Sequence, residues 1–178
     1  MQRSLRKAAP SDESALNDLL LRSALQLQRD SYSEEQIRAA IGPVFGVDEQ
    51  MIQDGTYYVV EQSGEIAGCG GWSFREALFG GRAVGESEPR MLDAQSEAAR
   101  VRAFFVDPLF ARQGIGSLIM QACEKAILGH GFTCGEISAT LVGEPFYREF
   151  GYTTTEYYEI DLKNAPPMRV ARMLKLYR

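Results

Sequence analysis

The sequence predicts an α+β (mixed α/β) fold. Segments typical of strands and of helices follow one another in the order β-α-α-β-β-β-α-β-α-β-β, which favours one mixed sheet with helices packed against it. The length of 178 residues suits one domain with a sizeable core. No repeat, low-complexity tract or linker divides the chain, so we expect a single domain over residues 1–178.

The first half of the chain combines a short strand, two helices and a hairpin. "RSLRKAAP" reads as a strand ending at Pro10, and Ser11 is placed to cap a helix whose leucines recur at helical spacing to about Gln28. "SEEQ", from Ser33 to Gln36, has the pattern of a capping box and predicts the start of a second helix. Two β-rich runs around a polar turn at residues 62–64 then predict an antiparallel hairpin.

The second half carries the best strand and the best helix of the sequence. A long connection over residues 75–98 precedes them, and its length indicates a lid, a substrate loop or disorder, with a solvated excursion as the alternative. The elements expected after it are a strand at 99–106, a helix from about 115 to 129, a strand at 134–141, a short helix at 145–150, and strands at about 153–162 and 168–177, the last two separated by "KNAPP".

Composition and charge limit the classes of function. The formal net charge of −5 and the pI of about 5.0 argue against nucleic acid as a partner, because phosphate binding needs a basic surface. Three cysteines without a C-x-x-C pair fit reduced thiols, and the single histidine, His130, cannot form a multi-histidine metal site. We find no signal peptide and no apolar run near the ~20 residues of a membrane helix, so we expect a cytoplasmic protein without a metal.

The stretch "ARQGIG", residues 111–116, places glycines where a strand passes into a helix. A P-loop needs Lys before the Ser or Thr that follows its last glycine, and here Ser117 follows Gly116 directly. A dinucleotide fingerprint needs a third glycine where Ile119 stands, although Glu136 lies where a ribose-binding acid would be expected. The surrounding antiparallel strands disfavour that reading.

A third interpretation is a pyrophosphate site at the start of a helix. Gly114 and Gly116 have no Cβ, so successive backbone N–H groups from Gln113 to Ser117, including that of Ile115, can converge on an anion. Arg112 could add a charge-assisted contact. The alternative is a plain turn in which glycine serves only a positive φ, and the spacing alone does not decide between the two.

"FFVDPLFARQGIGSLIM" resembles the acyl-CoA-binding motif of the GNAT superfamily of N-acetyltransferases, and "PFYREFGY" resembles the closing motif of the same superfamily. "LRKAAPSDESALNDLL" is similar to its first strand and helix, so the order of motifs agrees over nearly the whole chain. One departure is Ala111, where the family pattern has Arg or Gln. The resemblance implies a splayed mixed central sheet of about seven strands flanked by about four helices.

The resemblance also implies an activity and a set of site residues. The family transfers an acetyl group directly from acetyl-CoA, its cosubstrate, to a primary amine. Tyr147 matches the family's frequent general acid, and the alternative for it is a packing tyrosine. The residues that would hold acetyl-CoA, along the strand and then around the pyrophosphate, are Phe104, Phe105, Val106, Arg112, Gln113, Gly114, Ile115, Gly116 and Ser117.

The base and the acceptor are less defined by sequence. A base would come from polar residues near the cosubstrate strand or from a bound water; the candidates are Glu136, Ser138, Arg102, Glu76 and Glu97. The resemblance places the acceptor against residues 28–46 and 57–75, whose aromatic residues Tyr32, Phe45, Trp72 and Phe74 would line a pocket or form core. We expect a small-molecule or peptide amine as partner, no membrane, and a possible homodimer through the C-terminal strands.

Other classes of protein stay open at this point. A non-catalytic acyl-CoA-binding sensor or regulatory domain would keep the glycine loop, but it would not need Tyr147. A nicotinamide-binding oxidoreductase is disfavoured by the missing third glycine. A purely structural protein would not require the loop at all.

Overall fold

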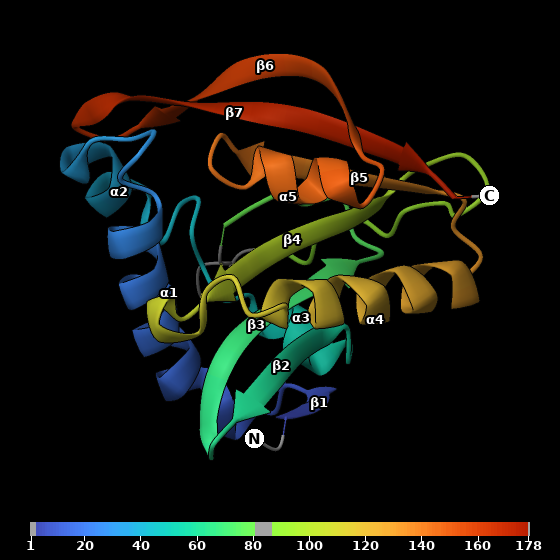
Figure 1. Cartoon of the computed structure of the whole chain (residues 1–178). Helices are drawn as coiled ribbons and strands as arrows, with labels where there is room; N and C mark the ends of the chain where they lie inside the picture. The colour runs from blue at the N-terminus through green and yellow to red at the C-terminus, as the bar shows by residue number, and fades with distance from the viewer. Residues whose placement is uncertain (1–2, 81–86, 178) are drawn as a thin grey trace.

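The computed structural model describes residues 3–80 and 87–177, and its centre is one mixed sheet (Figure 1). The strand order is β1-β2-β3-β4-β5-β7-β6. Neighbouring strands are antiparallel except β4 and β5, which are parallel. The strands are β1 Arg3–Lys7, β2 Tyr57–Gln62, β3 Glu65–Ser73, β4 Ala99–Val106, β5 Cys134–Thr140, β6 Thr153–Leu162 and β7 Ala165–Leu176.

Helices pack on this sheet from separate parts of the chain (Figure 1). They are α1 Glu13–Leu27, α2 Glu34–Ala40, α3 Glu49–Gln53, α4 Ile115–Gly129 and α5 Glu144–Glu149, with short 3₁₀ turns at Pro10–Asp12 and Pro108–Phe110. The fold class is confirmed, with α3 added to the helices expected from sequence. Among the residues that the structure describes, no helix is long and apolar enough to cross a membrane.

The sheet has a hydrophobic cluster on each face. Adjacent residues of β2 show this, because Val60 belongs to the cluster beneath α4 and Val59 to the cluster beneath α1. Helix α4 contributes Ile119 to the first cluster, and α1 contributes Leu16 to the second. Burial on both faces therefore fixes the register of the central strands.

Two predicted boundaries were wrong. Ser11 does not cap α1: residues Pro10–Asp12 form a 3₁₀ turn, and Asp12 is bound by Arg6 and by the N–H of Ala9. Strand β7 begins before the two prolines of "KNAPP", because Asn164 takes a positive φ of 60° in a tight turn. The prolines fall at a shift in the β6–β7 register, where no ladder hydrogen bond is required of them.

The capping box at the start of α2 is confirmed. The Ser33 hydroxyl accepts a hydrogen bond from the N–H of Gln36 at 3.2 Å, and the Gln36 side chain accepts one from the N–H of Ser33 at 3.0 Å. The Gln36 side chain also donates to the carbonyl of Pro167 at 2.7 Å, which ties α2 to β7.

Loss of this cap should be measurable. We expect Ser33→Ala to cost about 1 kcal/mol and to lower Tm by roughly 2–4 °C, because it leaves an N–H at the helix start unpaired. Ser31→Ala is the matched control, since the Ser31 side chain is exposed and donates to no described residue. Equal melting temperatures for the two variants by differential scanning calorimetry would contradict the prediction.

Candidate active site

Strands β4 and β5 separate after a short contact. Their parallel pairing covers only Ala99 with Gly135 and Arg100 with Glu136, and the rest of the two strands have no common register. The sheet is therefore splayed at its centre, as the resemblance implied. Helix α5 lies beside β5 at this opening (Figure 1).

Strand β4 contains a bulge at this opening. Ala103 has φ +59°, which is unusual for a residue other than glycine, and neither Ala103 nor Phe104 has a paired residue in β3 or β5. Opposite the bulge, a Cβ on Gly70 would lie 2.7 Å from the Phe104 ring, so glycine at that position makes room for the ring. The hydroxyl of Tyr57 donates to the carbonyl of Ala103 at 2.8 Å.

That hydrogen bond fixes the direction of the next amide. In a trans peptide the C=O and the following N–H point to opposite sides. Since the Ala103 carbonyl points at Tyr57, the N–H of Phe104 points away from Tyr57. The peptide at the bulge thus has one polar group satisfied and one directed away from the β2–β3 side.

A cavity of about 120 Å³ occupies the opening. Strand β4 lines it with residues 102–105 and β5 with residues 137–140, and Tyr147 reaches it from α5. Of the predicted strand residues, Phe104 and Phe105 line the cavity and Val106 does not. The remaining lining residues are Gln28, Val44, Phe45, Leu78, Phe79, Gly80, Gly143, Ile160 and Val170.

Tyr147 is buried in the cavity wall, with 7% of its surface exposed. Its ring packs against the rings of Phe104 and Tyr152, and its hydroxyl makes no hydrogen bond to any residue that the structure describes. Burial raises the pKa of Tyr147 well above its usual value, with a smaller contribution from Cys123. The phenol is therefore a protonated donor at neutral pH with no partner in the described chain.

The glycine loop forms the start of α4. Arg112 and Gly114 both have positive φ, at 62° and 81°, and α4 begins at Ile115. None of the N–H groups from Gln113 to Ser117 donates to another described residue. A Cβ on Gly114 would meet nothing within 4 Å, whereas one on Gly116 would lie 3.2 Å from the Phe146 ring. Gly114 therefore faces open space, and Gly116 allows α5 to pack closely.

The side chains of this loop have different roles. Arg112 is exposed and forms no ion pair within the described ranges. The Gln113 side chain donates to the carbonyl of Leu109 and accepts from Gln62, each at 3.2 Å, so it is held by the protein itself. Ile115 is fully buried in the core under α4, so only its backbone faces the loop.

The carboxylates considered as bases are paired with arginines and do not line the cavity. Glu136 is buried between Arg100 and Arg172. Glu97 is partly exposed, and the hydrogen bond from Arg90 lowers its pKa to about 2. Glu76 pairs with the same arginine. Ser138 does line the cavity, and its hydroxyl hydrogen-bonds that of Tyr158.

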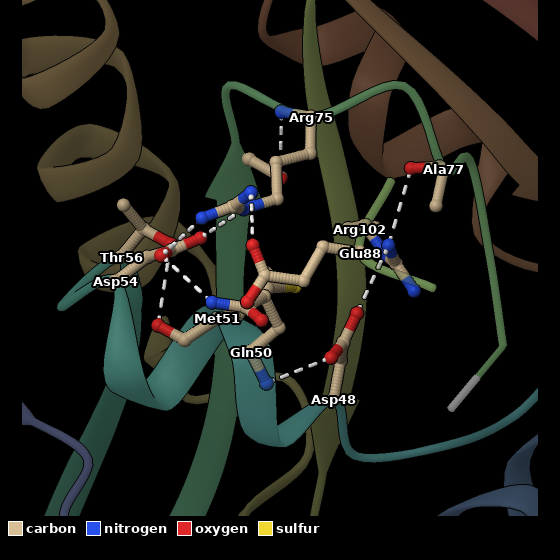
Figure 2. A network of polar contacts seen from close by, with 10 residues as sticks. Asp48, Gln50, Met51, Asp54, Thr56, Arg75, Ala77, Glu88 and Arg102 are labelled. Carbon is tan, nitrogen blue, oxygen red and sulfur yellow. Dashed lines mark hydrogen bonds and ion pairs between the residues drawn. The ribbon is translucent and has the colours of Figure 1, made fainter. Parts of the chain in front are cut away.

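Arg102 is buried and lines the cavity, and Figure 2 shows it beside Asp48 and Ala77. Its guanidinium pairs with Asp48 at 3.3 Å and donates to the carbonyls of Ala77 and Gly80. Burial lowers the pKa of Arg102, while Asp48 opposes that effect. Arg102 is thus a structural cation that holds the connection after β3, and we do not assign it as a base.

The same network anchors the long connection (Figure 2). Arg75 pairs with Asp54 at 2.8 Å and with Glu88 at 3.4 Å, and a β-bridge joins Arg75 to Met91. Residues 78–80 line the cavity, which supports the substrate-loop alternative for this connection; residues 81–86 lie outside the described part. Sequence reasoning missed Asp48 and α3, although Asp48 is a helix N-cap whose side chain accepts from the N–H of Gln50.

The four aromatic residues predicted to line the acceptor pocket do not all reach the cavity. Only Phe45 lines the cavity. Trp72 is fully buried beneath α4 beside Phe74, and the Tyr32 hydroxyl joins the carbonyl of Arg169 to the N–H of Leu141. These three are structural.

A splayed sheet, a strand with a bulge at the opening and a helix start with free amides define the architecture of an acyl-CoA-dependent transferase. Residues 53–154, more than half of the chain, match the model of the acetyltransferase (GNAT) domain. The chain therefore belongs to the GNAT family and is an acetyltransferase. No curated protein sequence matches the chain significantly.

Solved structures agree with this assignment. The chain is similar to a GCN5-related N-acetyltransferase from Rhodopseudomonas palustris, with a TM-score of 0.72, 19% identity, and coverage of 99% of this chain and 96% of that one. It is similar to the PaiA N-acetyltransferase from Thermoplasma acidophilum in complex with coenzyme A, with a TM-score of 0.66, 15% identity and coverage of 99% and 100%. It is also similar to the ribosomal-protein-S18-alanine N-acetyltransferase from Escherichia coli, with a TM-score of 0.61, 12% identity, and coverage of 97% of this chain and 92% of that one.

These findings confirm the resemblance seen in the motifs and the fold that it implied. The family match shows acetyl transfer as the general activity, which decides against a nicotinamide-binding oxidoreductase.

Proposed function

We propose that the protein transfers an acetyl group directly from acetyl-CoA to a primary amine of a small-molecule or peptide acceptor. The observation that carries this proposal is the meeting of three features in one cavity. They are the unpaired bulge of β4 at Phe104, the hydroxyl of Tyr147, and the opening between β4 and β5.

Acetyl-CoA would be held mainly by backbone groups. The pyrophosphate would accept hydrogen bonds from the N–H groups of Gln113 to Ser117, which have no described partner, with the dipole of α4 behind them. Arg112 is the exposed cation of this loop and would add an ionic contact. The pantetheine arm would run along β4 at Phe104, Phe105 and Val106, on the side where β5 has moved away.

The reaction would join the amine nitrogen to the thioester carbon and break the carbon–sulfur bond. The N–H of Phe104 would donate to the carbonyl oxygen as negative charge develops on it. Tyr147 would give its proton to the departing thiolate of CoA and recover a proton released by the attacking amine. We assign removal of that proton to bound water, because the described carboxylates do not line the cavity.

The acceptor would be recognised chiefly by its apolar part. Phe45, Leu78, Phe79 and Ile160 line the cavity, and the cation of Arg102 is already paired with Asp48. The S18-alanine N-acetyltransferase named above supports an amine as the acceptor class.

We also propose that the protein is cytoplasmic and that it forms a homodimer. Cys69, Cys123 and Cys134 are all unpaired, which suits a reducing compartment. Strand β6 is the outer strand of the sheet, so its edge is open to a second copy. The acidic net charge disfavours nucleic acid as a partner.

Thermal unfolding with acetyl-CoA, CoA, NADH and ATP, each at about 1 mM, tests the cosubstrate. A ligand at ~100 times its Kd adds about 2.7 kcal/mol, which corresponds to a rise in Tm of roughly 5–10 °C for a chain of this size. We expect this rise with acetyl-CoA and CoA alone. A rise only with NADH or ATP would overturn the proposal.

An amine screen with detection of the CoA thiol then tests the reaction. Release of CoA that depends on a primary amine supports direct transfer. Binding of acetyl-CoA without release for any class of amine would instead favour the sensor or regulatory domain.

A further inference from the structure

Arg3 connects the first strand of the chain to the glycine loop. Its Nη1 donates to the carbonyl of Gln113 at 2.8 Å, and its Nε donates to the Gln62 side chain at 2.7 Å. Gln62 stands opposite Arg3 in the β1–β2 register. One guanidinium therefore bridges the β1–β2 pair and a backbone group of the loop.

Gln62 and Gln113 extend this connection. The Gln62 side chain donates to the Gln113 side chain at 3.2 Å, and Gln113 donates in turn to the carbonyl of Leu109. Gln62 is buried, with 2% of its surface exposed, so the network starts from a fixed point in the sheet. The loop is consequently held from the β1 side by both its backbone and its side chain.

The bond to the Gln113 carbonyl determines where the next N–H points. In a trans peptide the carbonyl of Gln113 and the N–H of Gly114 are directed oppositely. With the carbonyl held by Arg3, the N–H of Gly114 is directed away from β1. Gly114 has a positive φ and no Cβ, so without this contact the peptide would have unusual freedom to rotate.

We propose that Arg3 is a positioning residue for acetyl-CoA: by holding the Gln113 carbonyl, it orients the Gly114 N–H toward the pyrophosphate. The proposal rests on the function proposed above. A cation on the carbonyl also polarises the peptide, which makes the N–H a stronger donor. Arg3 forms no ion pair with a described acidic residue, so its charge is not neutralised locally.

Arg6 offers a matched control on the same strand. Its guanidinium pairs with Asp12 and Glu61, each at 2.7 Å, and its described hydrogen bonds and ion pairs include none to residues 107–117. Arg3→Ala and Arg6→Ala remove the same side chain from β1, and only the first removes a contact to the loop.

The test measures the Kd of CoA and the kinetics of acetyl transfer for the untagged full chain. We expect Arg3→Ala to raise the Kd of CoA and the KM of acetyl-CoA about 5- to 20-fold, in line with one hydrogen bond to a charged group. The kcat and the KM of the amine should stay unchanged. The Kd of CoA for Arg3→Lys should lie between the values for wild type and Arg3→Ala, because lysine keeps the charge and loses the forked guanidinium that reaches two acceptors. Arg6→Ala should match the wild type.

Two further measurements separate positioning from other effects. Acetylpantetheine lacks the pyrophosphate, so its KM should be the same for Arg3→Ala and wild type; an equal rise for both thioesters would indicate a general structural defect and overturn the proposal. The Arg3→Ala effect should persist between about 0.05 and 0.5 M salt, where a loss caused only by long-range attraction would fade. Such fading would also overturn it.

The outcomes distinguish this inference from the proposed function. If the wild type does not bind CoA, the proposed function fails. If the wild type binds CoA and Arg3→Ala binds it equally well, the function stands and the positioning role is wrong. Melting temperatures of all variants are measured first, and binding is compared well below the lowest of them.

Discussion

Tyr147→Phe is expected to lower kcat about 100-fold, the lower end of what a positioned proton donor contributes, and to leave the Kd of acetyl-CoA within about two-fold of wild type. The substitution removes only the hydroxyl, which has no hydrogen-bond partner among the described residues, so no internal bond is broken. The ring and its contacts with Phe104 remain. Initial rates under saturating amine and equilibrium binding of acetyl-CoA provide the two measurements.

The pH dependence follows from the direction of the Tyr147 pKa. Burial disfavours the charged phenolate and raises the pKa, so the neutral phenol is the dominant form through neutral and moderately alkaline pH. Tyr147 therefore keeps its proton over the assay range, and kcat should not fall on the alkaline side through titration of this group. A rise of rate with pH would report deprotonation of the amine.

Tyr152→Phe is the matched control for Tyr147. Tyr152 is also a buried phenol, in contact with the Tyr147 ring, but its hydroxyl hydrogen-bonds that of Tyr177 at 2.6 Å. It does not line the cavity. We expect Tyr152→Phe to cost stability and to leave kcat unchanged. An unchanged kcat for Tyr147→Phe would mean that Tyr147 is a packing tyrosine.

Sequence patterns predicted the elements that bury a continuous apolar face. Strand β4 and helix α4 were predicted closely, because each has a long stretch of the right period. Helix α3 was missed, since a helix of this length shows hardly more than one turn of any pattern. The start of β7 was placed too late because proline normally ends a strand, whereas here a register shift accommodates it.

The candidate site was predictable where it depends on backbone and not where it depends on packing. Gly114 and the free amides around it follow from a local motif, and the structure shows the positive φ that the motif requires. The pairing of Glu136 with arginines of β4 and β7 could not be predicted, since it depends on which strands become neighbours. The contact of Arg3 with the Gln113 carbonyl joins residues 110 positions apart, so no local sequence pattern could predict it.

Gly114→Val is expected to weaken acetyl-CoA binding by more than about 10-fold, which is more than 1.4 kcal/mol. Its Cβ would meet no protein atom within 4 Å, so the side chain would occupy the space in which the pyrophosphate is proposed to lie. The positive φ of 81° adds a conformational cost of about 1–2 kcal/mol for any residue with a Cβ, and this cost affects stability as well.

Gly131→Val separates these two effects. Gly131 lies just beyond the other end of α4, has φ +86°, and a Cβ there would also meet nothing within 4 Å. The two variants should therefore lose similar stability in a denaturant titration, because both place a β-branched residue at a positive φ in open space. Only Gly114→Val should lose affinity for acetyl-CoA in isothermal titration. Wild-type affinity in Gly114→Val would show that the glycine serves the turn alone, and the pyrophosphate site would have to lie elsewhere.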